Sequence, residues 1–425
     1  MVKIEPFAVE QWMDEYEVTP GVINIAETCA ASVSIDDLKT LSKQEDGASP
    51  VNLSTKLTYG AIRGSEKLRG LVAGLFAEET VETLPADNVL ITQGAILANF
   101  LLLYALVGPG DHAVCVYPTY QQLYGVPKSL GAEVSLWKLK RENGFVPDVT
   151  ELESLVKSST KMIILNNPNN PTGATIPKDV LGHVVEFARA RDIIVLCDEV
   201  YRPLYHSLPA EADIPPSILS FGYDKTISTG SMSKAWALAG IRLGWIASRD
   251  RGIIDAIAAA RDYTTISVSQ LDDQVASFAL SDGVRPALRG RNLELARTNL
   301  KLLENFVEEH QGVCSWVKPT AGTTAFVHFT NGGKPVDDVR FCIDVLEKTK
   351  VMFVPGSKCF GHDQDFKGYV SDAPSRSRAK GLPPSQALRC KVRRQMANGN
   401  WSRSGSGTCR KQMCWSRGYT GLENT

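Results

Sequence analysis

The sequence predicts an α/β protein: a large three-layer α/β/α domain with a mainly parallel sheet, joined to a smaller α+β domain. A chain of 425 residues exceeds one ordinary hydrophobic core. Short β-branched runs alternate with longer helical patterns from about residue 60 to 250, as in sheets covered by helices. After Arg249 the pattern becomes mainly helical. Residues 45–285 are therefore predicted to form the large domain, and residues 1–44 and 286–370 the small one.

The elements expected in the large domain follow from hydrophobic periodicity. The expected strands cover residues 112–117, 133–139, 161–165, 193–197, 226–229 and 243–247. The expected helices cover residues 66–77, 95–107, 121–130 and 180–191. Because these two kinds of segment alternate, the sheet is expected to be parallel for most of its width.

The elements expected after residue 249 are helices at 253–263, 270–280 and 291–310, then strands at 325–329 and 351–354 with a helix at 336–348 between them. This order suits an α+β domain. The first forty-odd residues precede the sheet pattern, so we expect them to pack with this second domain.

The composition changes abruptly after Val370. The last part of the chain contains eleven Lys or Arg residues and only two acidic ones, and isoleucine is absent from it. Residues 371–425 are therefore predicted to form a basic tail that cannot bury a core and is disordered. Two origins remain open: a natural basic tail, or sequence produced by a frame change or a retained intron near codon 370.

Composition excludes several classes of function. A formal net charge of -1 gives no reason to expect nucleic acid or an anionic membrane as a partner. The longest apolar stretch, residues 100–107, is too short to span a bilayer. Nine scattered cysteines without a Cys-x-x-Cys pair or a secretory signal favour reduced thiols and a cytoplasmic location. Six scattered histidines without metal-ligand spacing argue against a metal hydrolase, and no metal is predicted.

Polar residues follow three of the expected strands directly. Asn167, Asp198 and Ser231 each come after an apolar run. Ligands bind parallel sheets beyond the carboxyl ends of their strands, so these residues are expected to share one pocket.

Lys234 closes the run Ser231-Met232-Ser233-Lys234 and is interpreted as the amine that holds pyridoxal phosphate as a Schiff base. It would also move the substrate's α-proton, with its pKa lowered by burial near cationic groups. Asp198 would pair with the pyridine nitrogen, since a buried carboxylate needs a charged partner. A surface lysine and a helix-capping aspartate are the plainer alternatives.

Further residues are candidates for the rest of the cofactor. Tyr201 and Asn170 can reach the ring oxygen, and Asn170 lies in a loop made rigid by two prolines. Tyr120 would stack on the ring. Phosphate contacts would come from a helix start, two hydroxyls and a guanidinium: Gly94, Ala95, Ser231, Ser233 and Arg242. Both tyrosines could instead be core residues, and the segment at Gly94 could be a plain turn.

Together these motifs resemble the class I/II aminotransferases, the fold-type-I pyridoxal phosphate-dependent enzymes, over about residues 50 to 360. The resemblance rests on the loop from Asn167 to Gly173, Asp198-x-x-Tyr201, Ser231-x-Ser233-Lys234 and Arg242. It implies for each residue the role given above. It also implies a homodimer with shared sites, because Tyr59 stands where the family tyrosine reaches the neighbouring subunit's phosphate. The sequence is more similar to members from specialised metabolism than to the aspartate enzyme.

One departure from the family pattern concerns the substrate. In the family a strand after a segment like 354–360 carries an arginine that binds the substrate carboxylate, whereas here Ser371, Asp372, Ala373 and Pro374 follow. Arg376 and Arg378 do not match the motif. The leading function is an aminotransferase for an amino acid and a 2-oxo acid. An α,β-eliminating carbon–sulfur lyase, a cyclase, and a cofactor-binding protein of low activity remain open.

Overall fold

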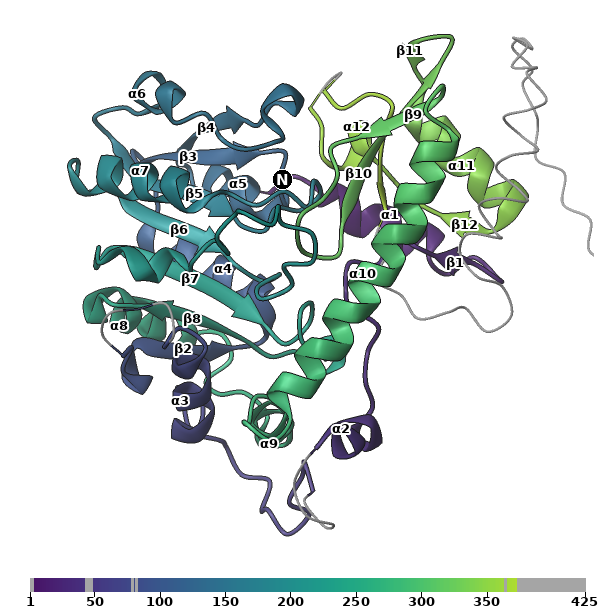
Figure 1. Ribbon diagram of the computed structural model, residues 1–425. Coiled ribbons are helices and arrows are strands. Elements are labelled where there is room, and N and C mark those ends of the chain that lie inside the picture. Colours follow the sequence, from purple (N-terminus) through teal and green to yellow (C-terminus); the bar gives the residue numbers. More distant parts are fainter. Residues whose placement is uncertain (1–3, 43–48, 78–79, 81–82, 363–364, 373–425) are drawn as a thin grey trace, which may run out of the picture.

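The computed structural model describes residues 4–42, 49–77, 80, 83–362 and 365–372. The predicted tail lies outside these residues from position 373 onward. Figure 1 shows a large sheet and a smaller one side by side, with the long helix α10 (Arg285–Glu309) running between them. The α/β prediction is confirmed by this arrangement.

The large sheet has seven strands. Their spatial order is β2 (Val89–Thr92), β8 (Gly244–Ser248), β7 (Thr226–Ser231), β6 (Ile194–Asp198), β5 (Thr160–Asn166), β3 (His112–Tyr117) and β4 (Glu133–Lys138). The pairings among β7, β6, β5, β3 and β4 are all parallel, whereas β8 runs antiparallel to both of its neighbours, β7 and β2. The sequence predicts all of these strands but β2, whose four residues merge with the apolar helix that begins two residues later.

Helices cover both faces of this sheet. One face carries α4 (Gly94–Leu106), α5 (Gln122–Ser129) and α8 (Arg251–Asp262), and the other carries α3 (Glu66–Gly74), α6 (Leu152–Leu155) and α7 (Lys178–Arg189). Successive strand residues point to opposite faces. Accordingly, Ala113 and Cys115 pack in one apolar cluster, and Val114 and Val116 pack in the other. The three-layer prediction is therefore confirmed.

Helix α10 begins six residues earlier than the predicted start at 291. Pro286 and Gly290 argue against a helix there when the sequence is read alone. Proline is tolerated in the first helical turn, where its missing N–H has no partner to lose, and this is where Pro286 lies.

The second sheet is antiparallel and centred on β10 (Ala325–Asn331). The other strands are β9 (Cys314–Trp316), β11 (Lys334–Pro335), β13 (Val354–Pro355) and β14 (Tyr369–Asp372), and α11 (Asp338–Thr349) and α12 (Gly356–Cys359) complete the region. The N-terminal segment packs here. Strand β1 (Ile23–Asn24) pairs with β12 (Val351–Met352), and Trp12 of α1 (Ala8–Tyr16) donates from Nε1 to the Phe353 carbonyl at 2.8 Å.

The order of the second sheet extends past the predicted limit at 370. Ser371 pairs with Phe326 and Val354, and Asp372 pairs with Ala325, so both belong to β14. Both side chains are buried. The prediction that structure ends at 370 is therefore wrong by at least these two residues. Hydrophobic periodicity could not predict this extension, because Ser371 and Asp372 are polar. They belong to the strand because their main chains pair with β10 and β13.

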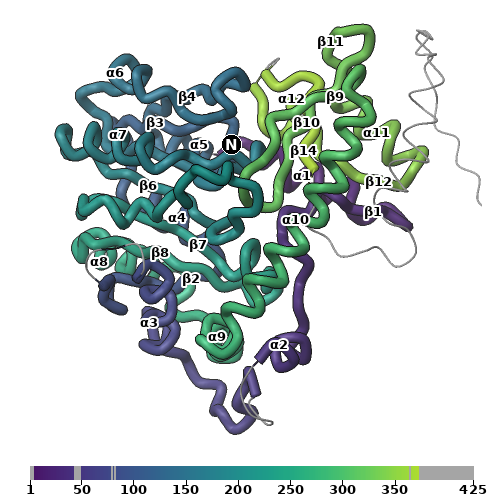
Figure 2. The backbone as a smooth tube through the Cα atoms, in the orientation of Figure 1, coloured from purple at the N-terminus to yellow at the C-terminus, as the bar shows by residue number. Residues whose placement is uncertain are grey.

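The remaining elements are short. They are α2 (Ile35–Leu41), α9 (Gln270–Ala279) and the 3₁₀ helices η1 (Ala86–Asn88), η2 (Arg141–Asn143), η3 (Val149–Glu151), η4 (Ile218–Phe221) and η5 (Ala239–Ile241). Figure 2 follows the chain through them. Within the described ranges no helix combines the length and apolar character needed to cross a bilayer. The six cysteines in those ranges have free, buried thiols.

Candidate active site

A cavity of about 470 Å³ lies where β5, β6 and β7 end. This volume falls in the range of roughly 300–1,000 Å³ that is typical of small-molecule sites. The structure brings nine of the predicted residues to its wall: Ala95, Tyr120, Asn170, Asp198, Tyr201, Ser231, Ser233, Lys234 and Arg242. The strand-end argument thus identifies a real concavity, and its residues come from widely separated parts of the chain.

Lys234 follows β7 and reaches back toward the N-terminal segment. Its Nζ donates to Thr28 Oγ1 at 2.5 Å and to Cys29 Sγ at 3.5 Å. Burial alone would lower the pKa of Lys234, but the neighbouring Cys29, Tyr201 and Glu27 outweigh it and raise that pKa. The expected lowering by nearby cations is therefore wrong for this cavity, because the groups around the ammonium are acidic.

Asp198 ends β6 and is 3% exposed. Its carboxylate accepts from Asn99 Nδ2 at 2.8 Å and from the Val200 amide at 3.1 Å. Burial raises the pKa of Asp198 to about 6 in spite of these two bonds. Asn99 is itself oriented by Thr229, whose Oγ1 donates to Asn99 Oδ1 at 2.8 Å. The carboxylate is held firmly but forms no ion pair among the described residues, so a positively charged ligand atom would stabilise it.

The loop after β5 positions Asn170. Its amide donates to Asn166 Oδ1 at 2.7 Å, and Asn166 Nδ2 donates to the Asp198 carbonyl at 3.1 Å. Asn170 is 8% exposed, and its Oδ1 has no hydrogen-bond partner within the described structure. An unpaired buried oxygen costs roughly 1–3 kcal/mol, so this side chain is arranged for a ligand. Tyr201 is almost fully buried on the same wall.

The start of α4 and Arg242 form a cradle for an anion. Gly94 has φ of +75°, and a Cβ there would lie 2.7 Å from Arg242 Nη2. A Cβ on Gly244 would lie 2.6 Å from the Ala95 nitrogen, so both glycines are needed for this close packing. Arg242 Nη1 donates to Ser233 Oγ at 3.3 Å. Main-chain donors at a helix start, a hydroxyl and a guanidinium are a suitable set for phosphate.

Tyr120 lines the cavity and is held in place by residues of the N-terminal segment. Its hydroxyl donates to Glu10 Oε1 at 3.1 Å, and its ring lies 4.8 Å from the Phe7 ring, centroid to centroid. Burial followed by the charge of Glu10 raises the pKa of this hydroxyl, which stays protonated at neutral pH. Its ring is available for stacking, as the sequence analysis expects.

Gly94 and Asn167 do not line the cavity, contrary to prediction, although Gly94 packs against Arg242, which does. Tyr59 is the third predicted residue of this kind. Its side chain is 81% exposed, and it does not appear on the cavity wall. Such a position suits a residue that serves a neighbouring subunit.

The sequence analysis missed several residues of the cavity. Asn99, Asn166, Thr28, Cys29, Glu27, Glu10 and Ser371 all line it. Asn99 left a detectable signal, since it is a lone amide inside the apolar helix α4. The N-terminal residues left none, because only the tertiary fold brings them to Lys234.

Comparison with known proteins gives a consistent result. Residues 45–366 match the family model described as aminotransferase class I and II. Capreomycidine synthase of Streptomyces vinaceus is 31% identical over 303 residues, which is 71% of this chain and 73% of that protein. A crystal structure of a PLP-dependent aminotransferase from Streptococcus suis 89-1591 has 36% identity and a TM-score of 0.79, covering 92% of this chain and 99% of that one. The PLP-dependent cyclase OrfR has 25% identity and a TM-score of 0.78, covering 92% and 98%.

Proposed function

The chain belongs to the class I and II aminotransferase family of enzymes, and from that premise we propose that it transfers an amino group between an amino acid and a 2-oxo acid with pyridoxal phosphate held at Lys234. The observation that carries the proposal is the cavity that Lys234 and Asp198 share with the anion cradle at Arg242. Catalysis by this cofactor needs an amine, a carboxylate and an anion site around one space.

The residues present fit this cofactor. Within the part of the chain that the structure describes, the buried carboxylate of Asp198 forms no ion pair and the buried Oδ1 of Asn170 accepts no hydrogen bond. The glycine at 94 leaves room beside Arg242. A ring nitrogen, a ring hydroxyl and a phosphate would satisfy these three positions. Bound pyridoxal phosphate supplies an electron sink for the bonds at the substrate's α-carbon.

The chain's own residues then have distinct tasks. Lys234 Nζ would take the proton from the substrate α-carbon and deliver it to the carbon that bore the cofactor's aldehyde oxygen. Asp198 keeps a positive charge on the ring nitrogen, and Asn99 prevents that carboxylate from turning away. Tyr201 and Asn170 orient the ring oxygen, while Ser231, Ser233, Arg242, Gly94 and Ala95 hold the phosphate and Tyr120 covers the ring.

The wall of the cavity favours a cationic substrate side chain. Among the described residues that line it, Glu10, Glu17, Glu27 and Asp198 oppose only Lys234 and Arg242. Lys234 and Arg242 are both assigned to the cofactor. Glu10, Glu17 and Glu27 lie on the N-terminal segment and accept hydrogen bonds from Tyr120, Asn24 and Cys29 respectively. None of the three is assigned to the cofactor, so their negative charge would favour a positive group in the cavity. We propose that the amino donor carries a positive group, as arginine does.

Replacing Glu27 with glutamine is expected to lower kcat/KM for arginine about tenfold more than it lowers kcat/KM for citrulline, because the loss of a charged hydrogen bond affects arginine alone. Any effect of Glu27 on Lys234 is common to both substrates. Citrulline has the same shape without the charge. The measurement is the amino-acid half-reaction, followed by visible absorbance, and the formation of a new amino acid from 2-oxoglutarate. Glu66→Gln, on the exposed start of α3, is the matched control. A wild type that prefers citrulline refutes the cationic side chain, and one that converts no amino acid refutes the function itself.

A cyclase or an eliminating lyase is the second candidate function. The similarity to capreomycidine synthase and to a PLP-dependent cyclase favours it, and both would use Lys234 in the same way. The assay with 2-oxoglutarate separates the possibilities. A cyclic product, or pyruvate with ammonia or a thiol, would replace transamination as the conclusion.

We propose further that the enzyme is a homodimer. Leu53, Leu57, Tyr59 and Tyr263 are each at least 72% exposed. The two segments that carry them adjoin, because Gln270 Nε2 donates to the Thr58 carbonyl at 2.7 Å. An apolar surface of this kind marks a site of association, and a second copy would also bring Tyr59 to a neighbouring cavity.

Leu57→Asp is expected to weaken the dimer at least about tenfold, because it places an unpaired charge in the contact. Sedimentation velocity over a range of concentrations measures this change. Val18→Asp changes an equally exposed apolar residue elsewhere and should leave the dimer intact. A wild-type monomer at micromolar concentration would contradict the proposal.

A further inference from the structure

A second cavity, of about 230 Å³, lies behind the strand ends that form the active site. Trp236, Trp245, Arg285 and Arg289 line it, together with Glu199 and Arg202. We call it the arginine–tryptophan pocket. It faces the other side of β6, because Asp198 and Glu199 are consecutive and line different cavities. It is therefore separate from the space assigned to cofactor and substrate.

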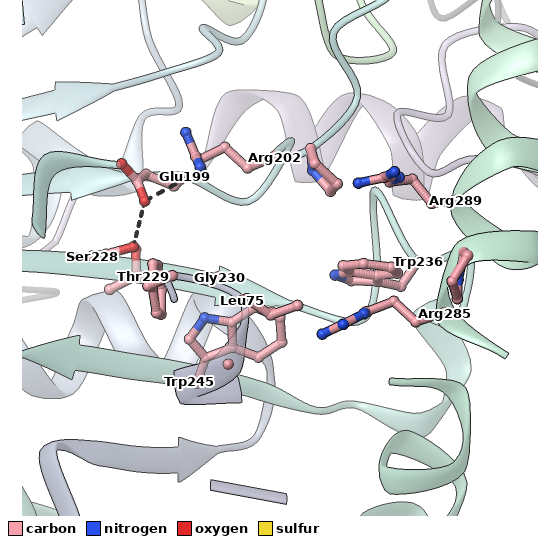
Figure 3. A pocket seen from close by; sticks show the side chains of 14 residues that line it. Leu75, Glu199, Arg202, Ser228, Thr229, Gly230, Trp236, Trp245, Arg285 and Arg289 are labelled. Atoms are coloured by element: carbon pink, nitrogen blue, oxygen red, sulfur yellow. Dashed lines mark hydrogen bonds and ion pairs between the residues drawn. The ribbon is translucent and has the colours of Figure 1, made fainter. Parts of the chain in front are cut away.

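At the left end of the arginine–tryptophan pocket in Figure 3, the buried charge of Glu199 is balanced by residues of the chain. Glu199 is 4% exposed, and its carboxylate accepts from Ser217 Oγ and Ser228 Oγ, both at 2.7 Å, and from the Ile218 amide at 2.8 Å. Arg202 Nε lies 3.7 Å from the same carboxylate. Arg202 and Glu199 thus balance each other, and neither is available to a ligand.

The right end carries positive charge that is not balanced. Arg285 and Arg289 extend from α10 into the same space (Figure 3). Arg285 pairs at 3.0 Å with Asp282, but that carboxylate is 93% exposed and contributes little. Arg289 has no acidic partner in the described part of the chain. Like charges one helical turn apart repel, so an anion between them would stabilise both.

Two indole rings form the flat, apolar part of the pocket wall. Trp236 and Trp245 are 2% and 5% exposed, yet both border the cavity. A Cβ on Gly230 would lie 2.6 Å from the Trp245 ring, so the glycine allows the indole to lie against β7. Indole surfaces of this kind pack well against planar rings. The volume lies below the roughly 300 Å³ at which pockets for drug-sized ligands begin, so the ligand must be small.

We propose that the arginine–tryptophan pocket is a second ligand site, which binds a small aromatic carboxylate. Its ring packs against Trp236 and Trp245, and its carboxylate lies between Arg285 and Arg289. Guanidinium groups bind carboxylates in a bidentate fashion, which selects the anion over an uncharged ring.

Benzoate is the probe for this site, with benzamide as the uncharged molecule of the same shape. Titration into the holoenzyme, followed by tryptophan fluorescence and calorimetry, should give a Kd for benzoate below about 1 mM and binding of benzamide at least about tenfold weaker. Arg289→Gln should weaken benzoate binding about tenfold, and the double variant with Arg285→Gln should weaken it further. Arg297→Gln, on an exposed part of the same helix, should change nothing.

Several results would overturn the proposal. Equal binding by the wild type and the double variant would place benzoate elsewhere, including the active site. If benzamide binds as tightly as benzoate, the pocket does not recognise the carboxylate. If inorganic phosphate binds as tightly as benzoate, the pocket does not recognise the ring. Arg289 is exposed on its helix, so Arg289→Gln should fold normally, and circular dichroism verifies this for each variant.

Discussion

Lys234→Ala is expected to abolish transamination, with kcat reduced on the order of 10⁴-fold, the upper range for loss of a positioned acid–base group. The same substitution removes the amine that would hold the cofactor aldehyde. The purified wild type should therefore be yellow, and reduction with borohydride should fix the cofactor mass on the peptide that contains residue 234. Absorbance and peptide mass spectrometry measure both effects without relying on activity.

Lys225→Ala is the matched control for this experiment. Lys225 lies directly before β7, whereas Lys234 follows that strand. Lys225 forms an ion pair at the surface with Asp192, at 2.6 Å. Its loss should leave colour and rate unchanged. Cofactor mass on any other peptide would refute the assignment of Lys234, and a fully active Lys234→Ala enzyme would refute the proposed chemistry.

Much of the large domain could be predicted because its strands are short, apolar and separated by amphipathic helices. The predicted strand at 112–117 coincides with β3, and the others differ by only one or two residues at either end. The prediction failed where the local sequence is typical of a different structure from the one that forms. Val89–Thr92 runs almost directly into an apolar helix, and Pro286 resembles a helix breaker although it lies in a first turn.

The residues of the active-site cavity also fall into two groups, those that the sequence could predict and those that it could not. Residues that follow strands directly could be placed in it, since topology brings strand ends together. Thr28, Cys29 and Glu27 could not, because they reach Lys234 only through the packing of the N-terminal segment on β12. The direction of the Lys234 pKa shift was misjudged for the same reason, because Cys29 and Glu27, two of the three groups that raise this pKa, come from the N-terminal segment.

Ser371 explains how the cavity departs from the family pattern. It lies on β14, is 4% exposed and lines the cavity, at the place where the sequence analysis expects an arginine for the substrate carboxylate. The described lining residues offer that carboxylate only Lys234 and Arg242, which are committed to the cofactor. The wild-type enzyme should therefore bind amino acids weakly, with KM far above that of a family member with the arginine.

Ser371→Arg is expected to raise kcat/KM for the preferred amino acid roughly 30-fold or more, mainly through KM, because a buried charge pair that lacks one partner loses roughly 2–5 kcal/mol. Ser371 lines the cavity, so the longer side chain would extend into it. Ser371→Gln supplies a polar side chain without charge and should give no such gain. Steady-state kinetics with each variant measure the effect. If Ser371→Arg and Ser371→Gln have equal KM values for the amino acid, residue 371 does not face the substrate carboxylate.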